Sequence, residues 1–319
     1  MKRLNNYICG ALILLLGAFF SIKGEYFLKI SNLLSITTTM AEFGIMAYGM
    51  MLAIMVSGIN LTIGSICGLC SLIIITLYKC GMPILLCVAA ALVCSLAMGL
   101  ITGLLIAKLK VAPMLMTLTL SMLFTGISYV ISKGNAISGF PRSYWFLGQE
   151  SILGIPAQTW LLVIITIVLS FVLRYTAWGT KLYAVGNNPV ATQYSGVNTV
   201  ATVTSAYVVS ALLAGVSGVI MSSRVATARL DLGVSYQTKC IAAVVLGGAS
   251  MAGGSGTPVG TLLGVTIISM LSNGLNHIGM SPYIQQFILG VILIAVLVLN
   301  ANVLPMIISF ARKRRKQPT

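Results

Sequence analysis

Residues 82–107 read MPILLCVAAALVCSLAMGLITGLLIA and contain no charged side chain. A helix needs about 20 predominantly apolar residues to cross the hydrocarbon core of a bilayer. This stretch is long enough, and a helix would satisfy its backbone polar groups without help from water. It therefore predicts a helix that spans a membrane.

The same criterion selects nine further stretches of the chain. They are residues 7–23, 36–58, 60–78, 111–133, 156–174, 200–222, 238–250, 256–276 and 283–308. The segment 238–250 is short and is either a span or a re-entrant segment. We predict an all-α integral membrane protein with about ten transmembrane helices. Residues 1–319 form a single domain, because none of the polar intervals between the apolar stretches could hold a soluble domain.

The composition excludes the soluble and disordered classes of protein. Hydrophobic residues make up 58% of the 319 residues and charged residues only 7%, whereas a soluble domain carries about 25% charged residues. The net charge of +15 arises mainly because the chain has only four acidic residues. The basic cluster 312–316 is interpreted as a solvated cytoplasmic end that contacts anionic lipid, and no nucleic-acid partner is expected.

The basic residues predict how the chain sits in the membrane. Residues 7–23 follow a basic start without a small-residue cleavage site, so they are expected to remain as the first span. An even number of spans then places both termini in the cytoplasm. On this arrangement the cytoplasmic side receives Lys2, Arg3, Lys108, Lys110, Arg174, Lys181 and the basic cluster 312–316. The acidic residues Glu25, Glu150 and Asp231 fall on the other side.

Two glycine patterns predict close approach of helices. Gly99/Gly103 and Gly260/Gly264 each form G-x-x-x-G, which lets helix backbones pack closely in lipid. Residues 57–65 also align without gaps to residues 247–255, and both segments follow an apolar stretch. Paired glycine-interrupted spans of this kind are found along transport pathways, although chance accounts for the similarity equally well.

Polar groups inside predicted spans are candidates for a translocation path, because they are costly in hydrocarbon. The candidates are Glu42, Asn60, Thr62, Asn273 and Asn276. The chain has no G-x-x-x-x-G-K-[ST] sequence and therefore no P-loop of its own. A proton- or sodium-coupled carrier would need acidic groups deep in the membrane, and only Glu42 could serve. The energy source is therefore expected outside this chain, with a self-sufficient secondary carrier or channel as the alternative.

One enzymatic alternative remains. The pattern G-x-S-G occurs at Ser217 and again at Ser255, as in intramembrane serine proteases, and His277 is the single histidine. Small-residue runs produce this pattern easily in membrane helices, so packing serines are the simpler interpretation. A single histidine also excludes a multi-histidine metal site.

The polar interval 174–199 contains signals for a short helix. Asn188 can cap a helix that begins at Pro189, and Gly196 can end it after Ser195. The result is a two-turn helix between two spans on the cytoplasmic face. It is either a plain surface loop or a rigid knob that docks into a cytoplasmic partner.

Four ordered motifs resemble the ribose-type permeases of bacterial ABC importers, and the resemblance covers nearly the whole chain. The motifs are SGINLTIGS at 57–65, LYAVGNNP at 182–189 with its continuation to Val197, IAAVVLGG at 241–248 with its continuation to Thr261, and NGLN at 273–276. The family usually has aspartate where this chain has Asn60, and commonly has an acidic residue where Val190 stands. Both departures put individual contacts in doubt.

The resemblance implies a ten-span permease domain in the bacterial cytoplasmic (inner) membrane. It would work as a homo- or heterodimer with a cytoplasmic ABC ATPase, which would bind ATP and Mg²⁺, whereas this chain would hold no cofactor. A periplasmic or lipid-anchored binding protein would deliver a monosaccharide or another small polar solute. The expected coupling residues are Gly186, Asn187, Asn188, Pro189, Ala191, Thr192, Ser195 and Gly196.

Overall fold

The computed structural model describes residues 2–23 and 27–300, and this part of the chain is helical apart from loops and four two-residue strands. Each predicted span overlaps a helix. These helices are α1 (Lys2–Lys23), α2 (Ile30–Met55), α3 (Ile63–Lys79), α4 (Ile84–Leu109), α5 (Pro113–Ser132), α7 (Ala157–Tyr175), α10 (Thr199–Val225), α11 (Tyr236–Leu246), α12 (Pro258–His277) and α13 (Pro282–Asn300). Glu25, the basic cluster 312–316 and the end of the predicted span 283–308 lie outside the described residues.

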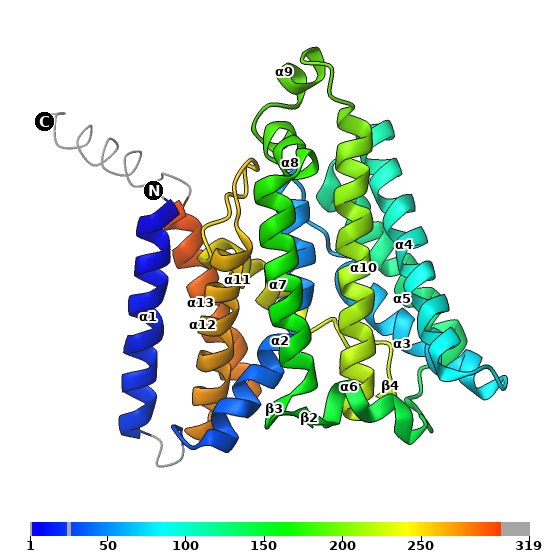
Figure 1. The fold of residues 1–319 in the computed structure, drawn as a ribbon, viewed down its shortest axis with the longest axis vertical. Coiled ribbons are helices and arrows are strands. Elements are labelled where there is room, and N and C mark those ends of the chain that lie inside the picture. The colour runs from blue at the N-terminus through cyan, green and yellow to red at the C-terminus, as the bar shows by residue number, and fades with distance from the viewer. Residues whose placement is uncertain (1, 24–26, 301–319) are drawn as a thin grey trace, which may run out of the picture.

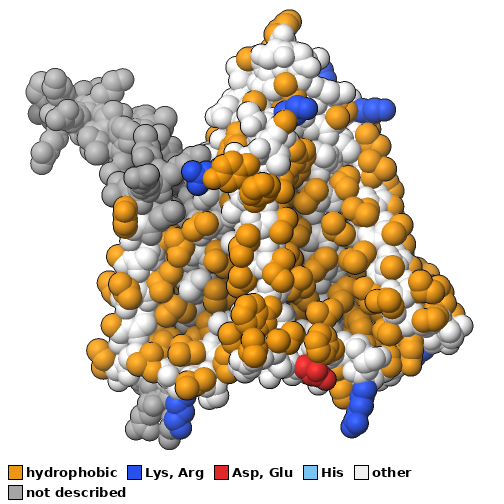
Figure 2. Space-filling model, in the orientation of Figure 1, with side chains coloured by type: hydrophobic (Ala, Val, Ile, Leu, Met, Phe, Trp, Pro, Cys, Tyr) orange, Lys and Arg blue, Asp and Glu red, His pale blue; other side chains and the backbone are white. Residues whose placement is uncertain are grey.

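Six of these helices are long and apolar enough to cross a membrane: α2, α4, α5, α7, α10 and α12. Within the described residues, α1, α3, α11 and α13 contribute shorter apolar stretches. The chain is therefore a multi-pass membrane protein, and the count of ten spans stays a prediction. Figure 2 shows hydrophobic side chains covering the middle of the visible face, with Lys and Arg side chains mainly toward its ends.

Helix α2 is the most buried of the long helices and packs against α10, α12, α11 and α7 (Figure 1). Helix α10 also packs against α4 and α3. The G-x-x-x-G pairs make the close contacts that the sequence predicts. A Cβ at Gly99 or Gly103 would meet α10, and a Cβ at Gly260 or Gly264 would overlap backbone at the end of α11.

The two ends of the bundle differ. One end, here called the α9 end, carries the short helices α8 (Ala177–Asn187) and α9 (Pro189–Tyr194) and the loop 247–257 (Figure 1). Helix α1 starts and α13 finishes toward this end. The opposite end carries the antiparallel strand pairs and two short helices. These elements are β1 (Ile137–Ser138) with β4 (Thr227–Ala228), β2 (Ser151–Ile152) with β3 (Ile155–Pro156), η1 (Arg142–Trp145) and α6 (Phe146–Gln149).

Two predicted spans differ from the structure in informative ways. Helix α2 begins at Ile30 rather than residue 36 and ends at Met55, because Ser57 adopts a left-handed backbone with φ of 61°. Helix α11 has 11 residues, a length of about 16 Å at 1.5 Å per residue. A hydrocarbon core is about 30 Å thick, so α11 alone is too short to span it.

Candidate functional site

Helices α8 and α9 form a capped protrusion at the α9 end. The Thr176 hydroxyl accepts a hydrogen bond from the Gly179 amide at the start of α8. The Asn188 side chain accepts one from the Ala191 amide at 3.0 Å, and Pro189 occupies the first turn of α9. Gly196 follows with φ of +81°. This is the predicted helix, one residue shorter, because Ser195 is its C-terminal cap.

The surface of α9 presents apolar side chains to solvent. Val190 is 62% exposed and Tyr194 is 90% exposed. Thr192, which the resemblance placed among the coupling residues, is buried, and its hydroxyl donates to the Asn188 carbonyl at 2.7 Å. Ala191 is exposed. Tyr194 is not among the predicted coupling residues, although a large amphipathic ring on a short polar helix is a sequence signal for an exposed contact residue.

The base of the protrusion is fixed to the end of α2. The Ser57 hydroxyl lies within hydrogen-bonding distance of the Gly186 carbonyl, at 3.1 Å, and of the Ala252 carbonyl, at 2.9 Å. The Gly254 amide donates to the Met55 carbonyl at 2.9 Å. A Cβ at Gly186 would overlap the Met55 carbonyl oxygen, so only glycine allows this approach. We call this contact of α2, α8 and loop 247–257 the α2–α8 junction.

Further hydrogen bonds join α8 to loop 247–257. The Asn187 amide group donates to the Gly254 carbonyl at 3.3 Å, and the Tyr183 hydroxyl donates to the Gly256 carbonyl at 2.7 Å. Three of the four sequence motifs thus meet at the α2–α8 junction. The two similar segments, 57–65 and 247–255, contact each other there through Ser57 and Ala252.

Glu42 lies in the interior beside α10 and α11. Its side chain is fully buried and forms an ion pair with Arg224, whose side chain is 42% exposed. The Tyr236 hydroxyl donates to the same carboxylate at 3.2 Å. These partners stabilise the charge in an apolar surrounding and hold the carboxylate in place.

The other predicted path residues form separate hydrogen-bonded clusters. Asn60 donates to the Ser210 hydroxyl at 2.9 Å, and its side-chain oxygen accepts from the Thr62 hydroxyl at 2.6 Å. Because Ser210 lies near the middle of α10, this cluster lies deep in the bundle. The structure places Asn60 and Thr62 together, and it places neither beside Asn273 or Asn276.

Asn273 and Asn276 lie at the opposite end of the bundle from α9. The side chains of Asn273 and Asn32 exchange two hydrogen bonds of 2.9 and 3.0 Å. The Nε2 atom of His277 lies 2.8 Å from the Oδ1 atom of Asn32. Asn276 accepts from the Gln285 amide at 2.6 Å. The partner Asn32 is not among the predicted residues, because the predicted span begins at residue 36. The role of these residues in a translocation path stays a prediction.

The serines of the two G-x-S-G sequences are not paired with the histidine. The Ser217 hydroxyl donates to the Glu42 backbone carbonyl, and the Ser255 hydroxyl accepts from the Ser250 amide at 3.0 Å. His277 contacts Asn32 instead. The described residues therefore contain no Ser–His dyad at these positions, and a nucleophile without its base is not activated.

Comparisons with known proteins identify relatives that are named permeases. A family model described as branched-chain amino acid transport system / permease component matches residues 32–297. The chain is 37% identical to the ribose import permease protein RbsC of Escherichia coli K12, covering 90% of this chain and 91% of that protein. It is 37% identical to the RbsC of Bacillus subtilis 168, over 87% of each chain. No solved structure matches at a significant level.

A more distant relative is named for a different solute. The D-allose transport system permease protein AlsC of Escherichia coli K12 is 29% identical, covering 91% of this chain and 89% of that protein. Relatives of nearly equal length thus carry the names of different sugars.

Proposed function

Because the chain belongs to the family of transport-system permease components whose model matches residues 32–297, we propose that it is the permease of a binding-protein-dependent ABC importer. In this importer it forms the translocation path for a monosaccharide or a similar small polar solute. The relatives are membrane subunits of importers rather than enzymes. The solute class rests on the names of the relatives. The transport role rests on the family and on the multi-pass helical architecture.

The α9 end faces the cytoplasm in this proposal, with the chain in the bacterial cytoplasmic membrane. Basic residues concentrate on the cytoplasmic side of membrane proteins. Lys108 and Lys110 lie at the end of α4 beside α9, and Lys181 lies on α8. Among the described acidic residues, Glu150 and Asp231 lie at the opposite end. Basic side chains also lie at the opposite end, for example Lys79 and Arg142, so the support for this orientation comes from the acidic residues and from the family.

Helix α9 is the surface that a separate ATPase subunit contacts. Val190 and Tyr194 expose apolar surface on a protrusion that stands clear of the helical bundle (Figure 1). Exposed aromatic side chains of this kind are typical anchors of protein interfaces. The ATPase carries ATP and Mg²⁺, and this chain supplies the rigid protrusion. The exposed Tyr194 on the capped helix is the observation that carries this proposal.

The α2–α8 junction transmits the movement of α9 into the bundle. Closure of the ATPase moves α8 and α9 as one body, because Asn188 caps the second helix directly after the first. Gly186 is in backbone contact with Met55 at the end of α2 and with Gly254 before α12. The spans then alternate between two arrangements, and the solute crosses between two copies of this chain or between this chain and a paralogue.

A binding protein delivers the solute at the end opposite α9. This part of the proposal follows from the family and from the orientation. No observation favours a self-sufficient carrier, because Glu42, the one buried carboxylate among the described residues, is held by Arg224 and Tyr236.

The experiment replaces Tyr194 with alanine and measures how much ATPase co-purifies with the full-length permease. We expect binding to fall about tenfold or more, the effect of removing an interface anchor. Tyr283→Ala is the matched control, because Tyr283 is 83% exposed on α13 at the opposite end. Uptake of labelled ribose and of other pentoses should fall in parallel with ATPase binding. Equal ATPase recovery from both variants and the wild type would refute the docking role of α9.

A further inference from the structure

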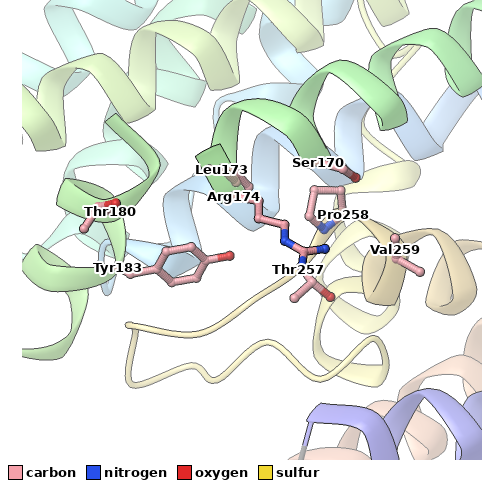
Figure 3. A pocket seen from close by; sticks show the side chains of 8 residues that line it. All are labelled: Ser170, Leu173, Arg174, Thr180, Tyr183, Thr257, Pro258 and Val259. Atoms are coloured by element: carbon pink, nitrogen blue, oxygen red, sulfur yellow. The ribbon is translucent and has the colours of Figure 1, made fainter. Parts of the chain in front are cut away.

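A cavity of about 620 Å³ opens at the α9 end between the last turns of α7, helix α8 and the first turn of α12. It lies beside the α2–α8 junction and shares Tyr183 and Thr257 with it. The lining residues are Ser170, Leu173, Arg174, Thr180, Tyr183, Thr257, Pro258 and Val259 (Figure 3). The cavity has a mixed character, with one cation, several hydroxyl groups and apolar side chains.

Arg174 gives the cavity its charge. Its side chain extends from the end of α7 toward Thr257 (Figure 3). Its neighbour Tyr175 lies within cation–π distance, 5.3 Å from the guanidinium carbon to the ring centre. Within the described residues, ion pairs join Glu42 to Arg224 and Asp231 to Arg229, and neither includes Arg174. The guanidinium group therefore has donors available for an anion, and its planar geometry suits a phosphate.

The first turn of α12 adds to the attraction for an anion. The Thr257 hydroxyl caps this 20-residue helix by accepting from the Gly260 amide at 3.1 Å, and Pro258 has no amide hydrogen. The positive end of the helix dipole thus lies at the cavity, where it favours negative charge. The buried Ser170 hydroxyl at the same cavity has no hydrogen-bond partner in the described part of the chain.

The surroundings place the cavity at the level where headgroups meet acyl chains. Tyr175, at the end of α7, is 65% exposed, and the Trp178 indole donates to the Ser205 hydroxyl at 2.8 Å. Tyrosine and tryptophan side chains concentrate at this level of a membrane. Val259 is 48% exposed and supplies apolar surface next to the cation. A ligand suited to this site has both a phosphate and an alkyl chain.

We infer that this cavity binds the phosphate of an anionic phospholipid from the leaflet that α9 faces. Arg174 pairs with the phosphate, the α12 terminus and Ser170 contribute further attraction, and an acyl chain lies along Val259. Basic pockets between helices on the cytoplasmic side are a known mode of headgroup binding. The assignment to the cytoplasmic leaflet rests on the proposed function, whereas the binding chemistry does not.

The test measures retention of a fluorescent phosphatidylglycerol by the full-length chain in a neutral detergent. We expect Arg174→Gln to weaken retention about fivefold, the effect of removing one cation from an anionic lipid contact. Lys181→Gln is the control, because Lys181 is exposed on α8 and does not line the cavity. Arg174→Lys should retain intermediate binding, and unchanged melting temperatures of the variants would show that they are folded.

Two further measurements distinguish a lipid phosphate from free inorganic phosphate as the ligand. Phosphatidylethanolamine should be retained less than phosphatidylglycerol by the wild type, and inorganic phosphate should not displace the lipid. Equal retention by wild type and Arg174→Gln would overturn the inference, and so would complete displacement by inorganic phosphate. The retention assay depends neither on transport nor on which side of the membrane α9 faces. If the proposed function were wrong, the Arg174-dependent retention of lipid would therefore still be observed.

Discussion

Helices α2 and α4 have the same length of 26 residues but opposite surroundings. In the most apolar part of α2, 83% of the residues are buried inside the protein, against 28% in α4. Helix α2 is the less apolar of the two and carries Glu42, while the interior turns of α4 carry no charge. In this pair, the more apolar helix faces lipid and the less apolar helix is surrounded by protein.

The difference has a functional consequence. A helix that faces lipid can tolerate changes on most of its surface, because lipid refills any gap. Helix α2 contacts α10, α11, α12 and α7, and its last residue lies in the α2–α8 junction. We therefore expect changes along α2 and at its end to affect stability and transport far more than similar changes on lipid-facing helices.

The largest effect is expected where α2 meets α8. Gly186→Ala places a methyl group against the Met55 carbonyl, and relief requires a backbone shift of α8 or α2. We expect a loss of more than about 3 kcal/mol, the upper range for overpacking, and loss of solute uptake. Gly126→Ala on α5 is the control, because nothing lies within 4 Å of its Cβ. Thermal unfolding and solute uptake are measured for both variants. Equal stability and equal uptake of Gly186→Ala and Gly126→Ala would contradict this account.

The second effect concerns the charge that distinguishes α2. Arg224→Gln leaves the buried Glu42 carboxylate without its cation, and we expect a loss of about 3 kcal/mol. The double variant Glu42→Gln/Arg224→Gln should recover part of that loss, because no buried charge is left unpaired. Arg229→Gln breaks a pair in which both side chains are 53% exposed, and it should cost less than about 1 kcal/mol. Chemical unfolding of the wild type and the three variants checks this order. Equal losses of stability in Arg224→Gln and Arg229→Gln would contradict it.

The smallest effect compares leucines on the two helices directly. Leu52 on α2 is fully buried, whereas Leu100 on α4 is 46% exposed. Lipid is as apolar as leucine, so Leu52→Ala loses mainly the cavity contribution, about 2 kcal/mol. Leu100→Ala should change stability by less than about 0.5 kcal/mol, because lipid fills the space. If Leu100→Ala lowered the melting temperature more than Leu52→Ala, the assignment of α2 to the interior and of α4 to the lipid face would be wrong.

Local signals explain what the sequence could predict. Helices α4 and α5 were located to within two residues, because a proline precedes or starts each apolar stretch and a lysine follows it. The first turns of α2 were missed, because Asn32 there pairs with Asn273 across 241 residues of sequence. The cap of α9 was predicted from Asn188 and Gly196, since capping depends on neighbours along the chain.

Long-range partners could not be predicted from a single sequence. The ion pair of Glu42 with Arg224 joins residues 182 positions apart, and nothing in either local sequence specifies the other. Burial of Thr192 and exposure of Tyr194 likewise depend on how α9 packs against α8 and the start of α10. The motifs around Ser57, Gly186 and Gly254 were each found in the sequence, but their meeting at one junction is visible only in the structure.

The most direct test of the central claim is the sidedness of α9. Tyr194→Cys would be treated with a membrane-impermeant maleimide in intact spheroplasts and in permeabilised ones. Native Cys80, exposed at the end of α3, reports on the opposite face. The account predicts labelling of Cys80 from outside and labelling of position 194 only after permeabilisation. Labelling of position 194 in intact spheroplasts would contradict the account, because α9 could not then contact a cytoplasmic ATPase.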